Sequence, residues 1–323
     1  MGQYKKFWYL LVAVLIGAFS ILGYYGFEVY REAPPIPQQY VSESGEKVIT
    51  HDDILHGQTA WQTTGGMQVG SVWGHGAYQA PDWTADWLHR ELTNWLDITA
   101  NQEFGKNFAD LNDEQQTLLK ARLTKEYRGS KVENGTVVLS NTRLAAMEKT
   151  AQYYISLYGD DPATKVTREH FAMKDNTLPD LQARKDLAKF FFWTAWTASA
   201  ERPNTHASYT NNWPHEPLIN NMPTPENVIW SIASVVFLIA GIGFVVWIWS
   251  FKKREDEKEP ATPEFDPLTK LQLTPSQRSL GKYLFTVLAL FVLQVTLGAV
   301  VAHYTVEGQE FYGIDISQYF PYS

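Results

Sequence analysis

Three long uncharged stretches limit the folds that this sequence can adopt. They cover residues 7–27, 228–250 and 283–304. An α-helix rises about 1.5 Å per residue and the hydrocarbon core of a bilayer is about 30 Å thick, so each stretch is long enough to cross a membrane as a helix. The sequence therefore predicts three transmembrane helices, with a large polar segment, residues 28–227, between the first two.

The first stretch has two interpretations. One is a cleaved signal peptide, because residues 18–20 (Ala-Phe-Ser) fit a cleavage site. The apolar run continues past that site, however, to Tyr24 and Tyr25, which are aromatic residues of the kind that gather at a membrane surface. We therefore expect a retained anchor over residues 1–27.

Positive charges orient the predicted helices. Lys5 and Lys6 precede the first stretch, and residues 252–254 (Lys-Lys-Arg) directly follow the second. Lys and Arg are enriched in loops on the cytoplasmic side of membrane proteins. Both clusters give the same orientation. Residues 28–227 lie on the outer side of the membrane, and the loop of residues 251–282 lies on the cytoplasmic side.

Composition excludes some partners and some bonds. The chain has 323 residues, a formal net charge of −8 and no cysteine. This charge argues against nucleic acid as a partner, because phosphate binding needs clustered Lys and Arg. Disulfides cannot form, so the exported segment must be held together by its core alone. The 12 Trp, 17 Tyr and 17 Phe residues suit a bulky core and membrane-surface belts.

Hydrophobic periodicity predicts a mainly helical exported domain. Apolar side chains recur at helical spacing in residues 51–62, 84–104, 112–127, 142–158 and 185–200. Asn134 and Gly135, flanked by valines, predict a short β-hairpin over residues 131–139. The prolines of residues 34–37 indicate a stiff lead-in to the domain.

A glycine-rich stretch, residues 65–83, has the local pattern of a covalent haem site but lacks the residues that would bind the haem. Haem c attachment requires Cys-x-x-Cys-His, in which two thiols bond the haem and an imidazole binds the iron. The corresponding positions hold Gly66, Val69 and Gly70. Because the chain has no cysteine, covalent attachment of haem is excluded.

Motifs at both ends of the domain resemble one known family. Residues 74–81 (Gly-His-Gly-Ala-Tyr-Gln-Ala-Pro) resemble the segment after the haem motif in the cytochrome c subunit of bacterial cytochrome-c-dependent nitric oxide reductase. Residues 210–214 (Thr-Asn-Asn-Trp-Pro) resemble the run after the final helix of that subunit. Residues 265–268 and 273–278 are similar to the quinol-dependent nitric oxide reductases, in which a degenerate cytochrome c domain is fused to the catalytic subunit. The chain thus resembles the N-terminal portion of that quinol-dependent family of the haem-copper oxidase superfamily.

The resemblance implies a mainly α fold, with transmembrane helices and an extracytoplasmic cytochrome-c-like helical domain that lacks haem c. Bulky side chains would fill the vacant haem position. The implied divisions are an N-terminal anchor (1–27), a periplasmic cytochrome-c-like domain (28–227), a transmembrane helix (228–250), a cytoplasmic loop (251–282), a transmembrane helix (283–304) and a periplasmic segment that starts the catalytic bundle (305–323). We expect the rest of that bundle to lie beyond these residues.

The implied activity is the reduction of two NO, with two electrons and two protons, to N2O and water. It would serve denitrification or NO detoxification at the bacterial inner membrane. The expected cofactors are low-spin haem b, high-spin haem b, non-haem iron and calcium, held mostly by the catalytic bundle, whose ligand motifs are not in these 323 residues. The expected partners are menaquinol or ubiquinol, the lipid bilayer, the remainder of the reductase core and a second copy in a homodimer. This portion would cap the haem core and contribute to the quinol site.

His303, Glu307 and Phe311 form the candidate quinol site. They are spaced by four, so they share one face if the third helix continues past Tyr304. An imidazole and a carboxylate can bind quinol hydroxyls and accept protons, and a phenyl ring can pack on the quinol ring. Spacing alone favours ordinary polar residues at a helix end. The resemblance adds a matching His-x-x-x-Glu-x-x-x-Phe at the family's proposed quinol site.

Gly76 and Tyr78 form the candidate calcium site. By composition alone, this glycine-rich loop would only turn the chain. The resemblance implies a calcium site. In the cytochrome-c-dependent reductases, backbone carbonyls at the matching Gly and Tyr help to hold a calcium ion that also binds haem propionates. Calcium readily takes main-chain oxygens, so side-chain identity matters little there. This sequence has His75 where the family has Glu, which puts side-chain contacts to the ion in doubt.

A second function remains open, namely a non-enzymatic membrane sensor or assembly protein with one exported helical domain. An anchor, a domain and a further span are the plan of many receptors. The other histidines show no metal-binding spacing such as His-Glu-x-x-His. The third membrane stretch distinguishes the two functions. A sensor would end in a cytoplasmic signalling helix, whereas we expect the segment after this stretch, residues 305–323, on the outer side of the membrane.

Overall fold

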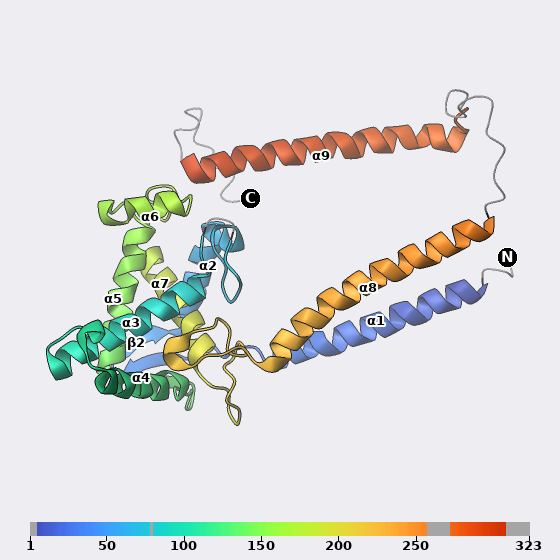
Figure 1. Cartoon of the computed structure of the whole chain (residues 1–323). Coiled ribbons are helices and arrows are strands. Elements are labelled where there is room, and N and C mark those ends of the chain that lie inside the picture. The colour runs from blue at the N-terminus through green and yellow to red at the C-terminus, as the bar shows by residue number, and fades with distance from the viewer. Residues whose placement is uncertain (1–4, 78–79, 257–271, 308–323) are drawn as a thin grey trace.

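The computed structural model describes residues 5–77, 80–256 and 272–307. Within these residues, three helices are long and apolar enough to cross a membrane: α1 (Lys5–Arg31), α8 (Pro225–Asp256) and α9 (Pro275–Glu307). Their apolar spans, Trp8–Arg31, Val228–Lys252 and Pro275–Val300, have mean hydropathies of 2.1, 2.5 and 2.1. The end of α1 and the start of α8 meet the globular domain on the same side (Figure 1). The prediction of a mainly α fold with transmembrane helices is confirmed.

One aromatic helix, α7 (Leu181–Ser199), forms the centre of the globular domain between α1 and α8. Its bulkiest side chains are almost inaccessible to water: Phe190, Phe191, Phe192, Trp193 and Trp196 are at most 6% exposed. A helix that is apolar on all sides must be covered by other elements. Three helices pack against it: α2 (His51–Thr63), α3 (Trp83–Phe104) and α5 (Asn141–Leu157).

Gly57 allows α2 and α7 to pack closely. A Cβ atom at this position would lie 2.0 Å from the main-chain oxygen of Asp186 and 2.7 Å from the Cβ of Phe190. No side chain fits in that space. The two helices are also joined at their surface by Lys189 of α7, whose Nζ lies 3.0 Å from the Asp53 carboxylate of α2.

The remaining elements surround this core. They are η1 (Gly66–Val69), η2 (Phe108–Asp110), α4 (Asp113–Arg128), η3 (Pro162–Thr164), α6 (Lys165–His170) and η4 (Pro217–Ile219). The last predicted helix of the domain was placed too late, because Asp180 caps α7 by accepting hydrogen bonds from the amides of Gln182 and Ala183. The other predicted helices begin and end within one residue of α2, α3, α4 and α5.

A small sheet lies against the helices and corrects the hairpin prediction. Strands β1 (Gln39–Ser42), β2 (Lys47–Thr50) and β3 (Thr136–Leu139) run in the order β2-β1-β3. Asn134 and Gly135 do form a turn, in which Glu133 and Thr136 bond each other's main chains. β3 nevertheless pairs along its length with β1, in parallel, and β1 pairs with β2 in an antiparallel arrangement. Burial of the side chains on β1 and β3 drives this long-range pairing over a local hairpin.

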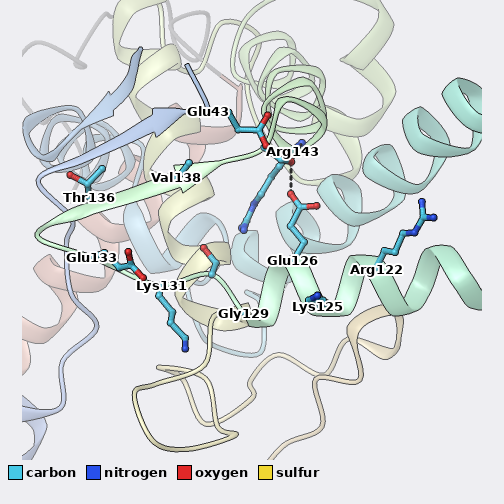
Figure 2. A pocket seen from close by; sticks show the side chains of 12 residues that line it. Glu43, Arg122, Lys125, Glu126, Gly129, Lys131, Glu133, Thr136, Val138 and Arg143 are labelled. Atoms are coloured by element: carbon cyan, nitrogen blue, oxygen red, sulfur yellow. Dashed lines mark hydrogen bonds between the residues drawn. The ribbon is translucent and has the colours of Figure 1, made fainter. Parts of the chain in front are cut away.

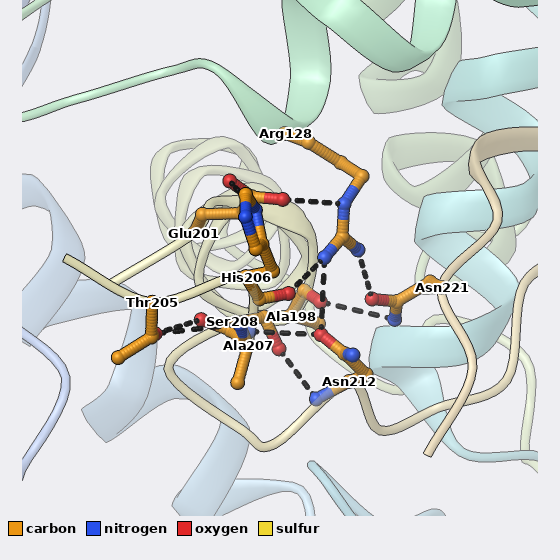
Figure 3. A network of polar contacts seen from close by, with 9 residues as sticks. All are labelled: Arg128, Ala198, Glu201, Thr205, His206, Ala207, Ser208, Asn212 and Asn221. Carbon is orange, nitrogen blue, oxygen red and sulfur yellow. Dashed lines mark hydrogen bonds and ion pairs between the residues drawn. The ribbon is translucent and has the colours of Figure 1, made fainter. Parts of the chain in front are cut away.

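Arg128, at the end of α4, fixes the segment that joins α7 to α8. Its Nε lies 3.0 Å from the Glu201 carboxylate, and one Nη donates to the Asn221 side chain at 2.8 Å. The other Nη donates to the His206 carbonyl and to the Asn212 side chain (Figure 3). A single guanidinium thus holds both ends of a loop that has little regular structure.

A buried ion pair links three helices in the same core. Glu91 of α3 and Arg143 of α5 have side chains only 1% and 2% exposed, and their Oε1 and Nε atoms are 3.3 Å apart. Tyr127 of α4 donates its hydroxyl to Glu91 at 2.9 Å, and Trp87 donates its indole N–H at 2.7 Å. Burial raises the pKa of the Glu91 carboxyl, although Arg143 and these donors oppose that effect. The carboxylate is therefore stable only with its partners in place.

Removing one member of this pair should destabilise the domain strongly. In Arg143→Met the Glu91 carboxyl stays buried without a cation, and we expect the free energy of unfolding to fall by about 3–5 kcal/mol. The matched control is Arg122→Met, which breaks an exposed pair with Glu103 at 2.7 Å and should cost about 0–1 kcal/mol. Denaturant unfolding followed by tryptophan fluorescence in detergent measures both, and equal losses would contradict this role for Glu91.

Candidate functional site

The degenerate haem motif lies in the turn directly after α2. Residues 66–69 form η1, and Gly66 and Gly70 have positive φ angles of 55° and 125°. A Cβ atom at Gly70 would lie only 2.1 Å from Nε1 of Trp83 and 2.3 Å from its Cε2. The indole of Trp83 thus occupies the space in which the iron-binding histidine of a haem c motif would begin. No side chain, and therefore no imidazole, fits at position 70.

An aromatic cluster fills the interior around Trp83. Trp83 is fully buried, and its ring stacks on Phe191 at 5.7 Å with an interplanar angle of 22°. Three further rings contact it, at centroid distances of 5.8 to 6.2 Å: Tyr154, Tyr158 and Phe171. These side chains take up the space beside Gly70, as expected for a cytochrome-c-like domain without haem. The sequence indicated bulky filling but not which rings supply it.

Asp82 holds the loop that follows the motif. Its Oδ2 accepts hydrogen bonds from the Ser71 hydroxyl and from the Gly74 amide, both at 2.6 Å. Its Oδ1 accepts from the Ala85 amide at 2.9 Å and so caps α3. The Ser71 oxygen in turn accepts from the Gly76 amide at 2.7 Å. Burial raises the pKa of the Asp82 carboxyl, while these donors oppose that effect.

The two motifs that carry the family resemblance meet at this loop. Trp213 donates its indole N–H to the Gly74 carbonyl at 2.7 Å. The ring of His75 lies 4.6 Å from the ring of Trp213. Residues 139 positions apart in the chain are therefore in direct contact. Sequence reasoning marked both segments but did not predict that they touch.

At the predicted calcium site, the structure describes Gly76 but not Tyr78. Gly76 has a φ of 87°, and a Cβ atom there would lie 3.0 Å from the Ala80 carbonyl oxygen, so the backbone requires glycine. The Gly74 carbonyl is already bonded to Trp213. Among the described residues, no group of three or more His, Cys, Asp or Glu side chains could hold a metal. Any ion here would depend on main-chain oxygens, and the calcium site stays a prediction.

The predicted quinol residues fall at the end of α9. His303 and Glu307 are one helical turn apart in this helix, and Glu307 is its last residue. The helix therefore does continue past Tyr304, as the spacing argument required. Phe311 lies outside the described residues. The quinol site stays a prediction.

Asp82, Trp83 and Trp213 are site residues that the sequence analysis did not identify. Asp82 could have been found, because an aspartate directly before a predicted helix is an N-cap signal. Trp83 and Trp213 carry no such signal, since their importance depends on contacts with distant residues.

A family model decides the identity of this domain. The model that matches describes the cytochrome c-like domain of the nitric oxide reductase protein NorB, and it covers residues 37–215. The chain belongs to the NorB family of nitric oxide reductases. The matched range includes the degenerate haem motif, residues 74–81 and Trp213, and it spans the helices from α2 to α7. A search of curated proteins found no match.

Membership in the NorB family confirms the coarser part of the sequence prediction. The globular domain is cytochrome c-like, and the absence of cysteine means that it has no covalent haem c. The match favours a reductase over the sensor or assembly protein that the sequence also left open.

Two glycine substitutions test whether Trp83 closes the haem position. In Gly70→Ala the new methyl group meets the indole of Trp83, whereas in Gly66→Ala nothing lies within 4 Å of it. Both residues have positive φ, so both variants carry backbone strain of about 1–3 kcal/mol. We expect Gly70→Ala to lose at least about 2 kcal/mol more unfolding free energy, because overpacking adds to the strain. Chemical unfolding in detergent measures the difference, and similar losses in the two variants would disprove the close contact.

Proposed function

We propose that this chain is the N-terminal part of a quinol-oxidising nitric oxide reductase. The observation that carries the proposal is a domain of the NorB family in which the haem c position is closed by Trp83. Electrons cannot enter this domain through a covalent haem. Three helices that can cross a membrane bring the chain to the lipid phase, where a quinol is the available two-electron donor.

The proposed reaction balances with a quinol as donor. Oxidation of one quinol to quinone releases two electrons and two protons, and reduction of two NO to N2O and water consumes the same number of each. His303 and Glu307 would bind the quinol hydroxyls, because an imidazole and a carboxylate can accept hydrogen bonds and then protons. Phe311 would pack on the quinol ring.

The proposed metal chemistry lies mostly outside these residues. The catalytic bundle would hold low-spin haem b, high-spin haem b and non-haem iron, which supply electron transfer and NO reduction. Gly76 and Tyr78 would contribute main-chain oxygens to a calcium ion. The loop around Gly76 fits this role, because hydrogen bonds to Asp82, Ser71 and Trp213 fix its backbone. A hard cation such as calcium could then be bound by main-chain carbonyls of this fixed loop.

The exported domain would act as a cap on the haem core. Its location would be the periplasmic side of the bacterial inner membrane, because Lys5 and Lys6 at the start of α1 and residues 252–254 near the end of α8 favour the cytoplasmic side. We further propose that the complete reductase forms a homodimer and that its donor is menaquinol or ubiquinol.

A carboxylate substitution tests the quinol site. In the complete reductase, Glu307→Gln should lower quinol-driven NO reduction by about 100-fold or more, since general acid–base groups contribute about 10²–10⁴-fold. The haem content, measured by optical spectra, should not change. NO reduction driven by an artificial donor that reduces the haems directly should also persist.

The control for Glu307→Gln is Glu226→Gln, which removes a carboxylate at the start of α8. This variant should keep quinol-driven activity. If Glu307→Gln keeps it as well, or if the purified protein contains no haem b and reduces no NO, the proposal fails.

Calcium removal tests the role of the glycine loop. Chelation should lower the melting temperature of the complete reductase, and added calcium, but not magnesium, should restore it. Calcium at about 100 times its dissociation constant stabilises a folded protein by about 2.7 kcal/mol. His75→Ala should not alter this response, because the proposed ligands are carbonyls. A melting temperature that does not depend on calcium would contradict the site.

A further inference from the structure

A cavity of about 580 Å³ opens between the exported domain and the first turns of α8. Its walls come from four parts of the chain that are distant in sequence. The domain side is formed by Pro34, by Trp73 and His75, and by the segment from Tyr209 to Pro223. The other side is formed by α8. We call this space the junction cavity.

The junction cavity lies at the start of the apolar span of α8. Val228 and Ile232 line it, and they stand four apart on one face of α8. The apolar span of α8 begins at Val228, so this wall is the outermost turn of the membrane-crossing helix. A ligand in the cavity can therefore keep an apolar tail in the bilayer while its head group contacts the domain.

The lining of the junction cavity is aromatic and uncharged. The rings of Trp73, His75, Tyr209 and Trp213 face it, and no Lys, Arg, Asp or Glu belongs to its described lining. A phospholipid phosphate needs cationic partners, preferably Arg or Lys. The lining offers none, and it instead suits a neutral, flat ring that can pack between other rings.

A second hollow, on the domain, differs from the junction cavity because charged side chains line it. A space of about 540 Å³ beside β3 is lined by Arg122, Lys125, Glu43 and Glu133, among others (Figure 2). Its charged groups of both signs suit water and ions. Of these two spaces, the aromatic and uncharged one lies next to α8 and the charged one lies on the domain.

Trp73 is held in the lining at the cost of backbone strain. Its φ is +53°, a left-handed value that is rare for bulky residues. The indole N–H donates to the Thr194 carbonyl and to the Thr197 hydroxyl, each at 3.1 Å, and the ring packs edge-on against Trp193. Strained residues of this kind persist where the surroundings enforce them and are concentrated at ligand sites.

His75 supplies polar groups in the otherwise apolar lining. Its side chain is exposed, and its ring rests against Trp213. No described residue makes a hydrogen bond to its ring nitrogens. A neutral imidazole has one donor and one acceptor nitrogen, so it can bond a hydroxyl or a carbonyl of a bound ring.

We infer that the junction cavity binds the ring of a quinol-class lipid. His75 bonds one ring oxygen, Trp73 and Trp213 pack against the ring, and the isoprenoid tail follows the face of α8 that carries Val228 and Ile232. The inference rests on the proposed function for the identity of the donor. It adds a binding site on the domain that is separate from the residues proposed on α9.

Photolabelling tests this site directly. The complete protein in detergent is illuminated with an azido-quinone that carries a short isoprenoid tail, and labelled peptides are identified by mass spectrometry. We expect label on the peptides that contain Trp73 and Trp213, with loss of label when unmodified quinone competes. His75→Ala should lower the competed labelling about fivefold, the effect of one lost hydrogen bond.

Two further variants keep the test decisive. His56→Ala removes an exposed histidine of α2 away from the cavity and should leave the labelling unchanged. Ile232→Trp places a large ring at the α8 wall, outside the core of the domain, and should abolish the labelling even if His75→Ala perturbs the loop. Labelling that survives both His75→Ala and Ile232→Trp, or that unmodified quinone does not displace, overturns the inference.

The remaining outcomes separate this inference from the proposed function. If a photoreactive phospholipid labels the same peptides and displaces the azido-quinone, the occupant is a phospholipid and the inference fails. Quinol-driven NO reduction without labelling of the cavity overturns the inference alone. Competed labelling in a protein that reduces no NO overturns the proposed function and leaves the quinone site standing.

Discussion

The packing of the cytochrome-c-like domain depends on how the space beside Gly70 is filled. A cytochrome c fold is normally completed by its haem, and this chain has neither the thiols nor the space for one. Trp83 takes that space, and aromatic rings of Tyr154 on α5 and Phe191 on α7 pack around its indole. With no disulfide available, the stability of the domain depends on this packing and on the buried Glu91–Arg143 pair.

Local signals in the sequence predicted the helices. Contacts between residues far apart in the chain could not be predicted from the sequence. Asn112 begins α4 with a capping box, and the glycine at position 129 ends it, so the start and end of this helix can be read from the sequence. β1 and β3 could not be predicted in this way, because Gln39 and Thr136 pair across 97 residues and neither strand has a clear periodic pattern. The same limit applies to the site. Residues 74–81 and 210–214 each carried a resemblance, but only the fold shows that Trp213 bonds Gly74.

The closed haem position bears on how electrons would reach a reductase of this family. Here the domain offers only aromatic side chains at that position, so we propose that reducing equivalents enter from the lipid phase. In that proposal the domain acts as a cap on the haem core. Trp213 and Arg128 fix the segment that leads into α8, and so they limit how the domain can move relative to the first turns of this helix.

His75 stands where the resemblance implies a glutamate, and it separates two proposed roles of one loop. A carboxylate at this position would add a negative charge, whereas an imidazole carries none. The backbone of Gly76 is fixed by Ser71 and Asp82, whichever side chain stands at position 75. We therefore propose that the main chain of the loop serves a cation through its carbonyls, while the His75 side chain, packed on Trp213, lines the uncharged cavity beside α8. Glutamate at position 75 would place a negative charge in that cavity and disfavour a neutral ring there.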